Sequence, residues 1–281
     1  MYELQRCSMM GQELSIIKLG GALLTDKSTP YAARDAILRA VAHEIKECID
    51  GGLLQSLILI HGVGSFGHPP VLEHGLHKGF HGPEQLLPLS RTQQIVQKFR
   101  NRITVHFQDV GIPVNLMLPS SMVVSKKMRM SRYFLEPLKG FLSLGMVPLL
   151  GGDMLYDAEM GFSVGSGDPL AVLLCQELGA NRLIFATDVP GIYETDPKID
   201  SAAPLLEKIN LNEFEQVLQR MGKAAKADAS GVMKGKLNSL IPAKELIEKG
   251  LEVSIISMME YGNLKALLKG FQVKHTRIIV Q

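Results

Sequence analysis

Short apolar runs alternate along the chain with longer segments in which apolar residues recur every three or four positions. The short runs are rich in Ile, Leu and Val, which is typical of strands buried in a sheet, whereas the longer segments have the spacing of helices with one apolar face. Strands are expected over residues 14–19, 57–60, 114–118, 146–150, 182–187, 252–257 and 276–280, and helices over residues 33–49, 90–110, 133–144, 169–178, 237–249 and 264–268.

This alternation predicts an α/β fold, a three-layer αβα sandwich whose central sheet is mainly parallel and covered by helices on both faces. A chain of 281 residues, 46% of them hydrophobic, is long enough for one large domain or for two closely joined halves. Residues 1–13 contain no apolar segment of the kind found in signal peptides. We therefore expect a short, loosely held extension followed by a single domain over residues 14–281.

Glycines cluster directly after two of the expected strands, at the strand ends where parallel sheets bind ligands. The segment from His61 to His68 follows the strand over 57–60 and contains three glycines. Glycine lets backbone N–H groups approach an anion closely because no Cβ is in the way, and histidine adds a donor whose charge changes near neutral pH. Taken alone the segment could be an ordinary turn, but its combination of features favours a phosphate-handling enzyme.

Residues 69–88 show little periodicity and include His74, His77 and His81. We expect a mobile loop or a short helical hairpin over the site. The spacing of the histidines fits one face of a helix and raises the question of a metal ion. Because no carboxylate or thiolate pattern accompanies them, we predict no metal site built from protein side chains.

Composition narrows the class of protein. The net charge is +2, and the basic residues are spread along the chain, which argues against a nucleic-acid partner. No apolar run reaches the roughly 18 residues that a membrane-spanning helix needs. The three cysteines lie far apart without metal-site spacing, as expected for reduced thiols in the cytoplasm. A cytoplasmic enzyme with a small-molecule substrate fits these features.

Further pieces carry candidate chemistry. Lys18 lies near a strand end that continues into Gly20 and Gly21, which places a cation beside a backbone anion site. Neither glycine turn has the spacing of a P-loop or of a dinucleotide fingerprint. The other pieces are Thr25-Asp26-Lys27, Ser166-Gly167-Asp168, the stretch from Ala186 to Tyr193, and the stretch from Asp228 to Lys236, where a phosphate could sit on a helix N-terminus. Ser and Asp are also residue types favoured at helix N-caps, so Ser166 and Asp168 could simply begin a helix.

In this order the pieces resemble the amino acid kinase superfamily, which includes acetylglutamate, aspartate, glutamate 5- and UMP kinases. The matching residues are a KxGG start at Lys18, a TDVxGxY stretch over residues 187–193 and a GxMxxK ending at Lys236. Within the superfamily, Thr25-Asp26-Lys27 with Ser65-Phe66-Gly67-His68 resembles the isopentenyl phosphate kinase branch, because most other branches lack a histidine at that place. A fosfomycin-phosphorylating branch shares much of the motif.

The resemblance implies ATP-dependent phosphorylation of isopentenyl phosphate to isopentenyl diphosphate, with Mg²⁺ on the ATP phosphates, in a homodimer. It implies an acceptor-binding half over about 14–165 and a nucleotide-binding half over about 166–281. Catalytic roles fall to Lys18, Lys27, His68, Asp168 and Lys236, with His68 binding the acceptor phosphate and Asp168 orienting the lysines. The nucleotide would contact Gly20, Gly21, Asp188, Tyr193 and Lys236. The acceptor would contact Ala22, Gly62, Val63, Gly64, Ser65, Gly67, His68 and Gly152.

The chain also departs from the family pattern. Val63 interrupts the usual GGG, Val232 replaces a glycine, Pro169 follows Asp168, and Ala22 stands for a frequent serine. Each change keeps the neighbouring glycine or charge, so fine backbone contacts are more in question than the reaction. Two alternatives stay open. One is a kinase of the same fold that acts on fosfomycin, another phosphonate or an amino-acid carboxylate, and the other is a non-catalytic nucleotide-sensing protein.

Overall fold

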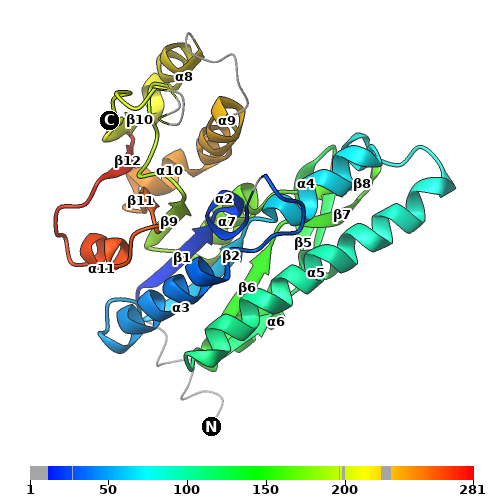
Figure 1. Ribbon diagram of the computed structural model, residues 1–281, viewed down its shortest axis with the longest axis horizontal. Coiled ribbons are helices and arrows are strands. Elements are labelled where there is room, and N and C mark those ends of the chain that lie inside the picture. The colour runs from blue at the N-terminus through cyan, green and yellow to red at the C-terminus, as the bar shows by residue number, and fades with distance from the viewer. Residues whose placement is uncertain (1–11, 27, 196, 198–199, 223–228) are drawn as a thin grey trace.

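The computed structural model describes residues 12–281 except for residues 27, 196, 198–199 and 223–228. Most of the expected N-terminal extension therefore lies outside the described residues. A central sheet of eight strands has the order β10-β12-β11-β9-β1-β2-β6-β3 (Figure 1). Its strands are β1 (Leu14–Leu19), β2 (Ser56–His61), β3 (Val114–Leu116), β6 (Val147–Gly151), β9 (Arg182–Thr187), β10 (Lys208–Asn210), β11 (Glu252–Ser257) and β12 (His275–Ile279).

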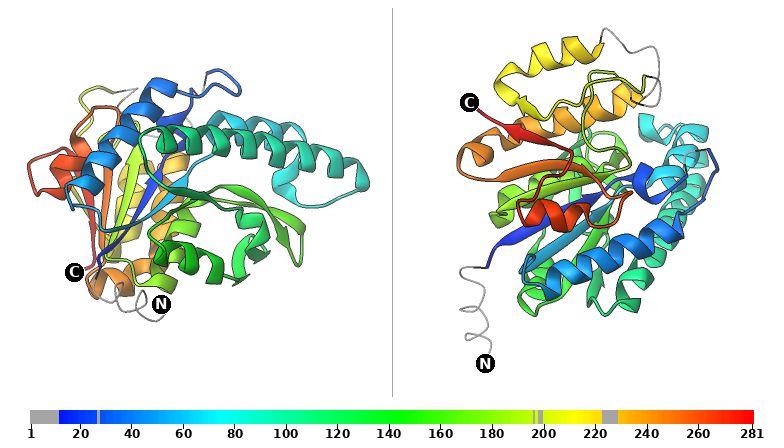
Figure 2. Two further views of the ribbon diagram at one scale, coloured as in Figure 1. Left: turned by 90° about the horizontal axis from the view of Figure 1, so that it is seen from below. Right: turned by 60° about the vertical axis from the view of Figure 1, so that its left-hand side comes forward.

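The central sheet is mainly parallel, and helices cover both of its faces (Figure 2). Only β12 pairs antiparallel with its neighbour β11, and β10 runs parallel to β12. One face packs against α2 (Gly21–Leu24), α3 (Asp35–Asp50), α5 (Leu86–Asp109) and α11 (Asn263–Leu268). The other packs against α6 (Glu136–Ser143), α7 (Gly167–Leu178), α8 (Phe214–Gly222), α9 (Ala229–Leu240) and α10 (Lys244–Glu248). The expected three-layer α/β fold is confirmed.

The period of two along each strand decides which layer a side chain enters. On β1, Ile16 packs in the α7/α9 layer and Ile17 in the α3/α5 layer. Lys18 therefore shares the α7/α9 face with Ile16. On β2, Ile60 packs in the α7/α9 layer, so the next residue, His61, enters the α5 layer, where its ring contacts Phe99 edge to face. Polar side chains at two neighbouring strand ends thus point into opposite layers.

A second, four-stranded sheet of order β5-β4-β7-β8 lies beside α4 (Gly64–Glu73) and α5 (Figure 1). It consists of the hairpins β4 (Val123–Lys126) with β5 (Arg129–Tyr133) and β7 (Asp153–Asp157) with β8 (Gly161–Gly165). The buried carboxylate of Asp157 ties the two hairpin turns together, because it accepts hydrogen bonds from the N–H groups of Lys127, Met128, Glu159 and Met160 at 2.8–3.1 Å. The sequence analysis did not anticipate this sheet.

Two expected helices differ from those observed, and prolines explain both. The helix expected over 133–144 begins only at Glu136, because Pro137 favours a helix start and Tyr133 still belongs to β5. The helix expected over 237–249 is divided near Pro242, which lacks a backbone N–H, into α9, a short 3-10 turn and α10. Since α9 begins at Ala229, Lys236 lies inside a helix and not ahead of one.

The segment over 69–88 is largely helical, so the expected helical hairpin describes it better than the alternative, a mobile loop. It contains the end of α4, 3-10 turns at Leu76–Lys78 and Pro83–Gln85, and the first turn of α5. Val71 and Leu76 pack against Met154 and Phe162 of the small sheet and form a separate core cluster. Within the part of the chain that the structure describes, no helix combines the length and apolar character needed to cross a membrane.

Candidate active site

The two glycine turns meet backbone to backbone at the carboxyl ends of β1 and β2. A Cβ on Gly21 would lie 2.6 Å from the backbone nitrogen of Gly64, and a Cβ on Gly62 would lie 2.5 Å from that of Gly21. The N–H of Gly62 donates to the carbonyl of Leu19 at 2.7 Å. No side chain fits between the turns, so these glycines are required by the packing of one turn on the other.

Thr25 holds the two turns together through its buried hydroxyl. Its Oγ1 donates to the carbonyl of Gly21 at 2.7 Å and accepts from the N–H of Ser65 at 3.0 Å. Gly64 has a φ of +47°, and a Cβ there would collide with the Thr25 hydroxyl. Thr25 belongs to the Thr25-Asp26-Lys27 motif, and this linking role is what the sequence analysis missed. Lys27 lies outside the described residues.

Val63 has a structural explanation. Its side chain fills the space next to two glycines: a Cβ on Gly152 would lie 3.0 Å from Val63 Cγ1, and a Cβ on Gly67 would clash with the Val63 side chain. A valine at this place therefore takes the volume that both glycines leave open. The departure from the usual glycine run is accommodated by packing across the end of β6.

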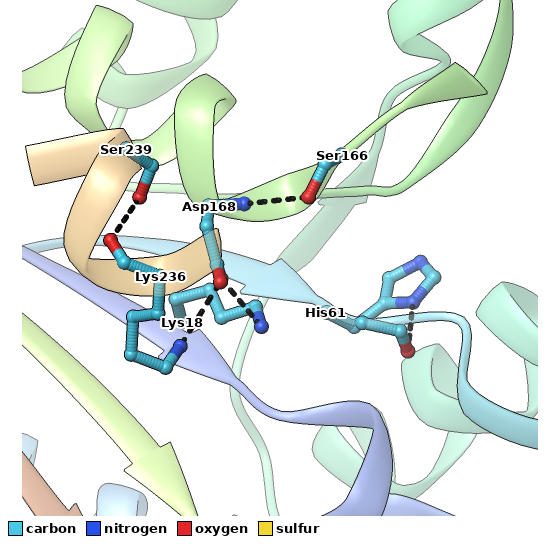
Figure 3. Close-up of polar contacts among 7 residues, drawn as sticks. Lys18, His61, Ser166, Asp168, Lys236 and Ser239 are labelled. Atoms are coloured by element: carbon cyan, nitrogen blue, oxygen red, sulfur yellow. Dashed lines mark hydrogen bonds and ion pairs between the residues drawn. The ribbon is translucent and has the colours of Figure 1, made fainter. Parts of the chain in front are cut away.

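Lys18, Asp168 and Lys236 form a compact charged cluster on the α7/α9 face (Figure 3). The Lys18 ammonium lies 2.6 Å from Asp168 Oδ1, and Lys236 Nζ donates to Asp168 Oδ2 at 3.0 Å. Lys236 Nζ also lies 4.2 Å from the centre of the Phe185 ring, a cation–π contact. Asp168 stands in the first turn of α7, where its N–H donates to the capping hydroxyl of Ser166 at 3.4 Å. One carboxylate thus anchors two buried lysines.

The pKa values of Asp168 and Lys236 are shifted within the cluster. Burial alone would raise the pKa of Asp168, but the charges of Lys18 and then Lys236 outweigh it and hold that pKa far below its ordinary value. Burial, followed by repulsion from Lys18, lowers the pKa of Lys236 to about 8, although Asp168 opposes the change. The aspartate is therefore ionised at neutral pH, and the ammonium of Lys236 begins to lose its proton just above it.

On the expected acceptor side, the structure places His68 in the second turn of α4, with an exposed side chain. Ser65 is buried and donates its N–H to the hydroxyl of Thr25, whereas Ala22 is half-buried in α2. Gly152 donates its N–H to the carbonyl of His61 at 3.1 Å. Of this group, only His68 combines a side chain that can donate a hydrogen bond with an exposed position.

On the expected nucleotide side, one expectation needs amending. The N–H of Gly20 donates to the carbonyl of Ala186 at 2.7 Å, so Gly20 contributes close packing on β9 and does not offer that group to a phosphate. Asp188 follows β9 and is half-buried. Tyr193 is also half-buried, pairs through its backbone with Leu205, and has a pKa raised by burial. Asp228 lies outside the described residues.

The sequence analysis did not find a buried polar network under the expected acceptor side. Arg100 of α5 is 1% exposed and contacts His61, Gly152 and Asp153. The sequence did contain a signal that Arg100 is buried. This residue falls four residues after Val96 and three before Ile103, on the buried face of α5. A charged residue at such a position needs buried partners.

Comparisons with known proteins agree with this geometry. The model of the amino acid kinase family matches residues 13–257. The chain is 34% identical to the isopentenyl phosphate kinase of Methanothermobacter thermautotrophicus over 94% of this chain and 98% of that protein. It is 31% identical to that of Methanocaldococcus jannaschii, over 81% of this chain and 86% of that protein. An X-ray structure of an isopentenyl phosphate kinase, 31% identical, matches with a TM-score of 0.79 over 94% of this chain and 99% of the other. The chain therefore belongs to the amino acid kinase family and, within it, to the isopentenyl phosphate kinases.

Proposed function

We propose that this protein transfers the γ-phosphoryl group of ATP to the phosphate of isopentenyl phosphate, releasing ADP and isopentenyl diphosphate. The observation that carries the proposal is the cluster of Lys18 and Lys236 on Asp168, close to the junction of the two glycine turns. Two buried ammonium groups on one carboxylate suit a place where two phosphate-bearing ligands meet. The 34% identity to an isopentenyl phosphate kinase over nearly the whole chain supports the same substrate.

Phosphoryl transfer between two anions requires that charge is neutralised and that the reacting groups are held in position. The bond from the γ-phosphorus to the β–γ bridging oxygen breaks as an acceptor oxygen forms the new bond to phosphorus, with attacking and leaving oxygens in line. The acceptor oxygen is already anionic, so no general base is needed. Lys18 and Lys236 would neutralise charge on the transferred group, while Asp168 fixes both ammonium groups in place. His68 would donate to the acceptor phosphate, more strongly when protonated.

The sheet itself suggests how the two substrates are divided. Residues 166–281 supply β9, β10, β11 and β12, and residues 14–165 supply the other four strands and the small sheet. We assign ATP to the first set, with Asp188 and Tyr193 beside it, and the acceptor to the second. The residues present fit a nucleotide polyphosphate. The buried cations Lys18 and Lys236 lie near the glycine turns, where no Cβ blocks access to the backbone.

Magnesium fits as a partner of the nucleotide. Among the described residues, no group of three or more His, Cys, Asp or Glu side chains could hold a metal ion. Mg²⁺ would therefore be carried mainly by the ATP phosphates, where it supplies further neutralisation of charge. The protein's own contribution is to hold Lys18, Lys236 and the glycine turns around that ligand.

A steady-state assay of ADP release across a panel of acceptors tests the proposal. The panel contains isopentenyl phosphate, fosfomycin, glutamate and N-acetylglutamate. Isopentenyl phosphate should give the highest kcat/KM. A higher value for fosfomycin or an amino acid would refute the substrate, and ATP binding without turnover on any acceptor would refute the activity in favour of a nucleotide sensor.

His68→Ala separates the acceptor site from the nucleotide site. It should lower kcat/KM for isopentenyl phosphate about tenfold or more, because a charge-assisted hydrogen bond worth roughly 1.5–3 kcal/mol is lost. The KM for ATP should stay within about twofold of the wild-type value, well below the tenfold that 1.4 kcal/mol would give. A variant with full activity at low acceptor concentration would remove His68 from the acceptor site.

We also propose that the enzyme works as a homodimer in the cytoplasm. The family resemblance supports the dimer. The thiols of Cys48 and Cys175 are unpaired and buried, and burial raises the pKa of each to about 12, which suits a reducing compartment in which they stay inert. Light scattering on the purified full-length protein tests the dimer, and a monomer at micromolar concentration would contradict it.

A further inference from the structure

Arg100 is a fully buried charge that the proposed reaction does not use. Its Nε donates to His61 Nε2 at 2.9 Å, and its Nη2 donates to the carbonyl of Gly152 at 3.1 Å. Its Nη1 lies 3.9 Å from Oδ2 of Asp153, which is also buried. Taking a guanidinium out of water costs several kcal/mol unless such partners compensate. Arg100 therefore needs these contacts, which lie at the end of β2 (His61), directly after β6 (Gly152) and at the start of β7 (Asp153).

The contact with Arg100 determines the tautomer of His61. Burial, and then the charge of Arg100, lowers the pKa of His61 well below its ordinary value, so the ring is neutral. A neutral imidazole has one donor and one acceptor nitrogen, and a guanidinium can only donate. Nε2 is therefore the acceptor and Nδ1 carries the proton. Nδ1 lies 3.2 Å from the carbonyl oxygen of Gly62 and donates to it.

This hydrogen bond orients the peptide that joins Gly62 to Val63. In a trans peptide the C=O and the N–H point in opposite directions. With the Gly62 carbonyl held toward the His61 ring, the N–H of Val63, the N-cap residue of α4, is directed away from that ring. Arg100 also fixes the Gly152 carbonyl, and Gly152 packs against Val63. One guanidinium thus sets two backbone turns on the acceptor side.

We propose that Arg100, acting through His61, is a positioning residue that aims the Gly62–Val63 peptide and the start of α4 at the acceptor phosphate. The inference rests on the proposed function, because it assigns this turn to the acceptor. Arg100 itself touches neither substrate. Its effect should therefore show in the binding of the acceptor and not in that of ATP.

A double-mutant cycle on the full-length protein tests the proposal with ATP and isopentenyl phosphate as substrates. Arg100→Met and His61→Leu should each raise the KM for isopentenyl phosphate about tenfold or more, which corresponds to about 1.4 kcal/mol. The KM for ATP should stay within about twofold, a change of less than 1.4 kcal/mol. Because both residues act on one peptide, the double variant should be no worse than the poorer single variant. Arg102→Met is the matched control, since Arg102 lies on the same helix in an exposed ion pair with Asp35 and should change neither KM.

Three outcomes would overturn the proposal: an unchanged acceptor KM in a folded Arg100→Met protein, equal rises in both KM values, or additive effects in the double variant. Thermal melting and calorimetric ATP binding establish that each variant is folded. If Arg100→Met does not fold, the tautomer of His61 in the wild-type protein decides. Long-range ¹⁵N–¹H spectra between about pH 6 and 9 span the ordinary titration range of histidine and should show a proton on Nδ1 throughout, whereas a proton on Nε2 would refute the proposal. Failure of the wild type to phosphorylate isopentenyl phosphate would refute the proposed function and leave this spectrum as a separate result.

Discussion

Asp168→Asn should disable the enzyme mainly by removing a proton from Lys236. The substitution keeps the size of the side chain but deletes the charge that lies 2.6 Å from the Lys18 ammonium and 3.0 Å from that of Lys236. Two buried cations then face each other without a counter-ion. Breaking a buried ion pair from one side costs about 3–5 kcal/mol. The cluster can avoid this cost only if one lysine becomes neutral.

The size of the shift follows from the charges. At an effective dielectric constant of about 20, unit charges about 4 Å apart interact by about 4 kcal/mol, and one pKa unit corresponds to about 1.4 kcal/mol. The pKa of Lys236 is about 8 in the intact cluster. Because about 4 kcal/mol divided by about 1.4 kcal/mol per unit is about three units, loss of the Asp168 charge should lower it by about three units, so that most Lys236 side chains are neutral at pH 7.5. A neutral amine neutralises no phosphate charge, and kcat/KM for ATP should fall about 100-fold at that pH.

The assay is the pH profile of kcat/KM for ATP, which reports the ionisation of the free enzyme. Lys236 is charged below its pKa, so the wild-type profile should be flat at neutral pH and fall above about 8. In Asp168→Asn the falling limb should move to lower pH, so that activity recovers about tenfold or more between roughly pH 8 and 6, as expected for a single titrating group. Lys244→Met is the control and should leave the profile unchanged, because Lys244 is a half-buried lysine at the start of α10 whose ammonium contacts Asn212. The expected change in the pKa of Lys236 corresponds to more than about 1.4 kcal/mol. A value of kcat/KM for ATP within about threefold of wild type, or a falling limb at the wild-type pH, would therefore refute the role of Asp168.

Two further substitutions test the scaffold around the site. Thr25→Val removes a hydroxyl that bonds both glycine turns, so it should lower the free energy of unfolding by about 1–3 kcal/mol and reduce kcat, whereas Thr25→Ser should behave like the wild type. Equal behaviour of the two variants in thermal melting and turnover would contradict the linking role. Burial raises the pKa of Asp157, but hydrogen bonds from Met128, Glu159 and Met160 reverse this and hold it at about 2, so its stabilising effect should be complete above about pH 4 and fade as the pH falls toward 2. Asp157→Asn should therefore be less stable than wild type in urea at pH 7, and this difference should shrink near pH 2; a constant difference would argue against it.

Local sequence was enough for the main strands of the central sheet, whereas the small sheet was not anticipated. Apolar runs bounded by glycine predicted the strands β1, β2, β9 and β11 nearly to the residue, because burial on both faces of a parallel sheet leaves a signal within a few positions. The motifs singled out Lys18, Asp168 and Lys236, and in the structure Asp168 contacts both lysines. The edges of helices were less predictable where Pro137 and Pro242 act, since a proline begins or divides a helix according to its neighbours.

Only the tertiary structure decided how the turns contact each other and what lies beneath them. Strand periodicity places His61 on the face opposite Lys18, but it does not say which helix covers that face. The partner, Arg100, comes 39 residues later in the chain and reaches His61 only because α5 packs there. The same holds for Val63, whose fit against Gly152 depends on β6 ending beside β2. Periodicity and backbone limits act over a few residues, whereas these contacts arise from packing between distant segments. This is why the sequence alone could not predict the contacts beneath the proposed acceptor side.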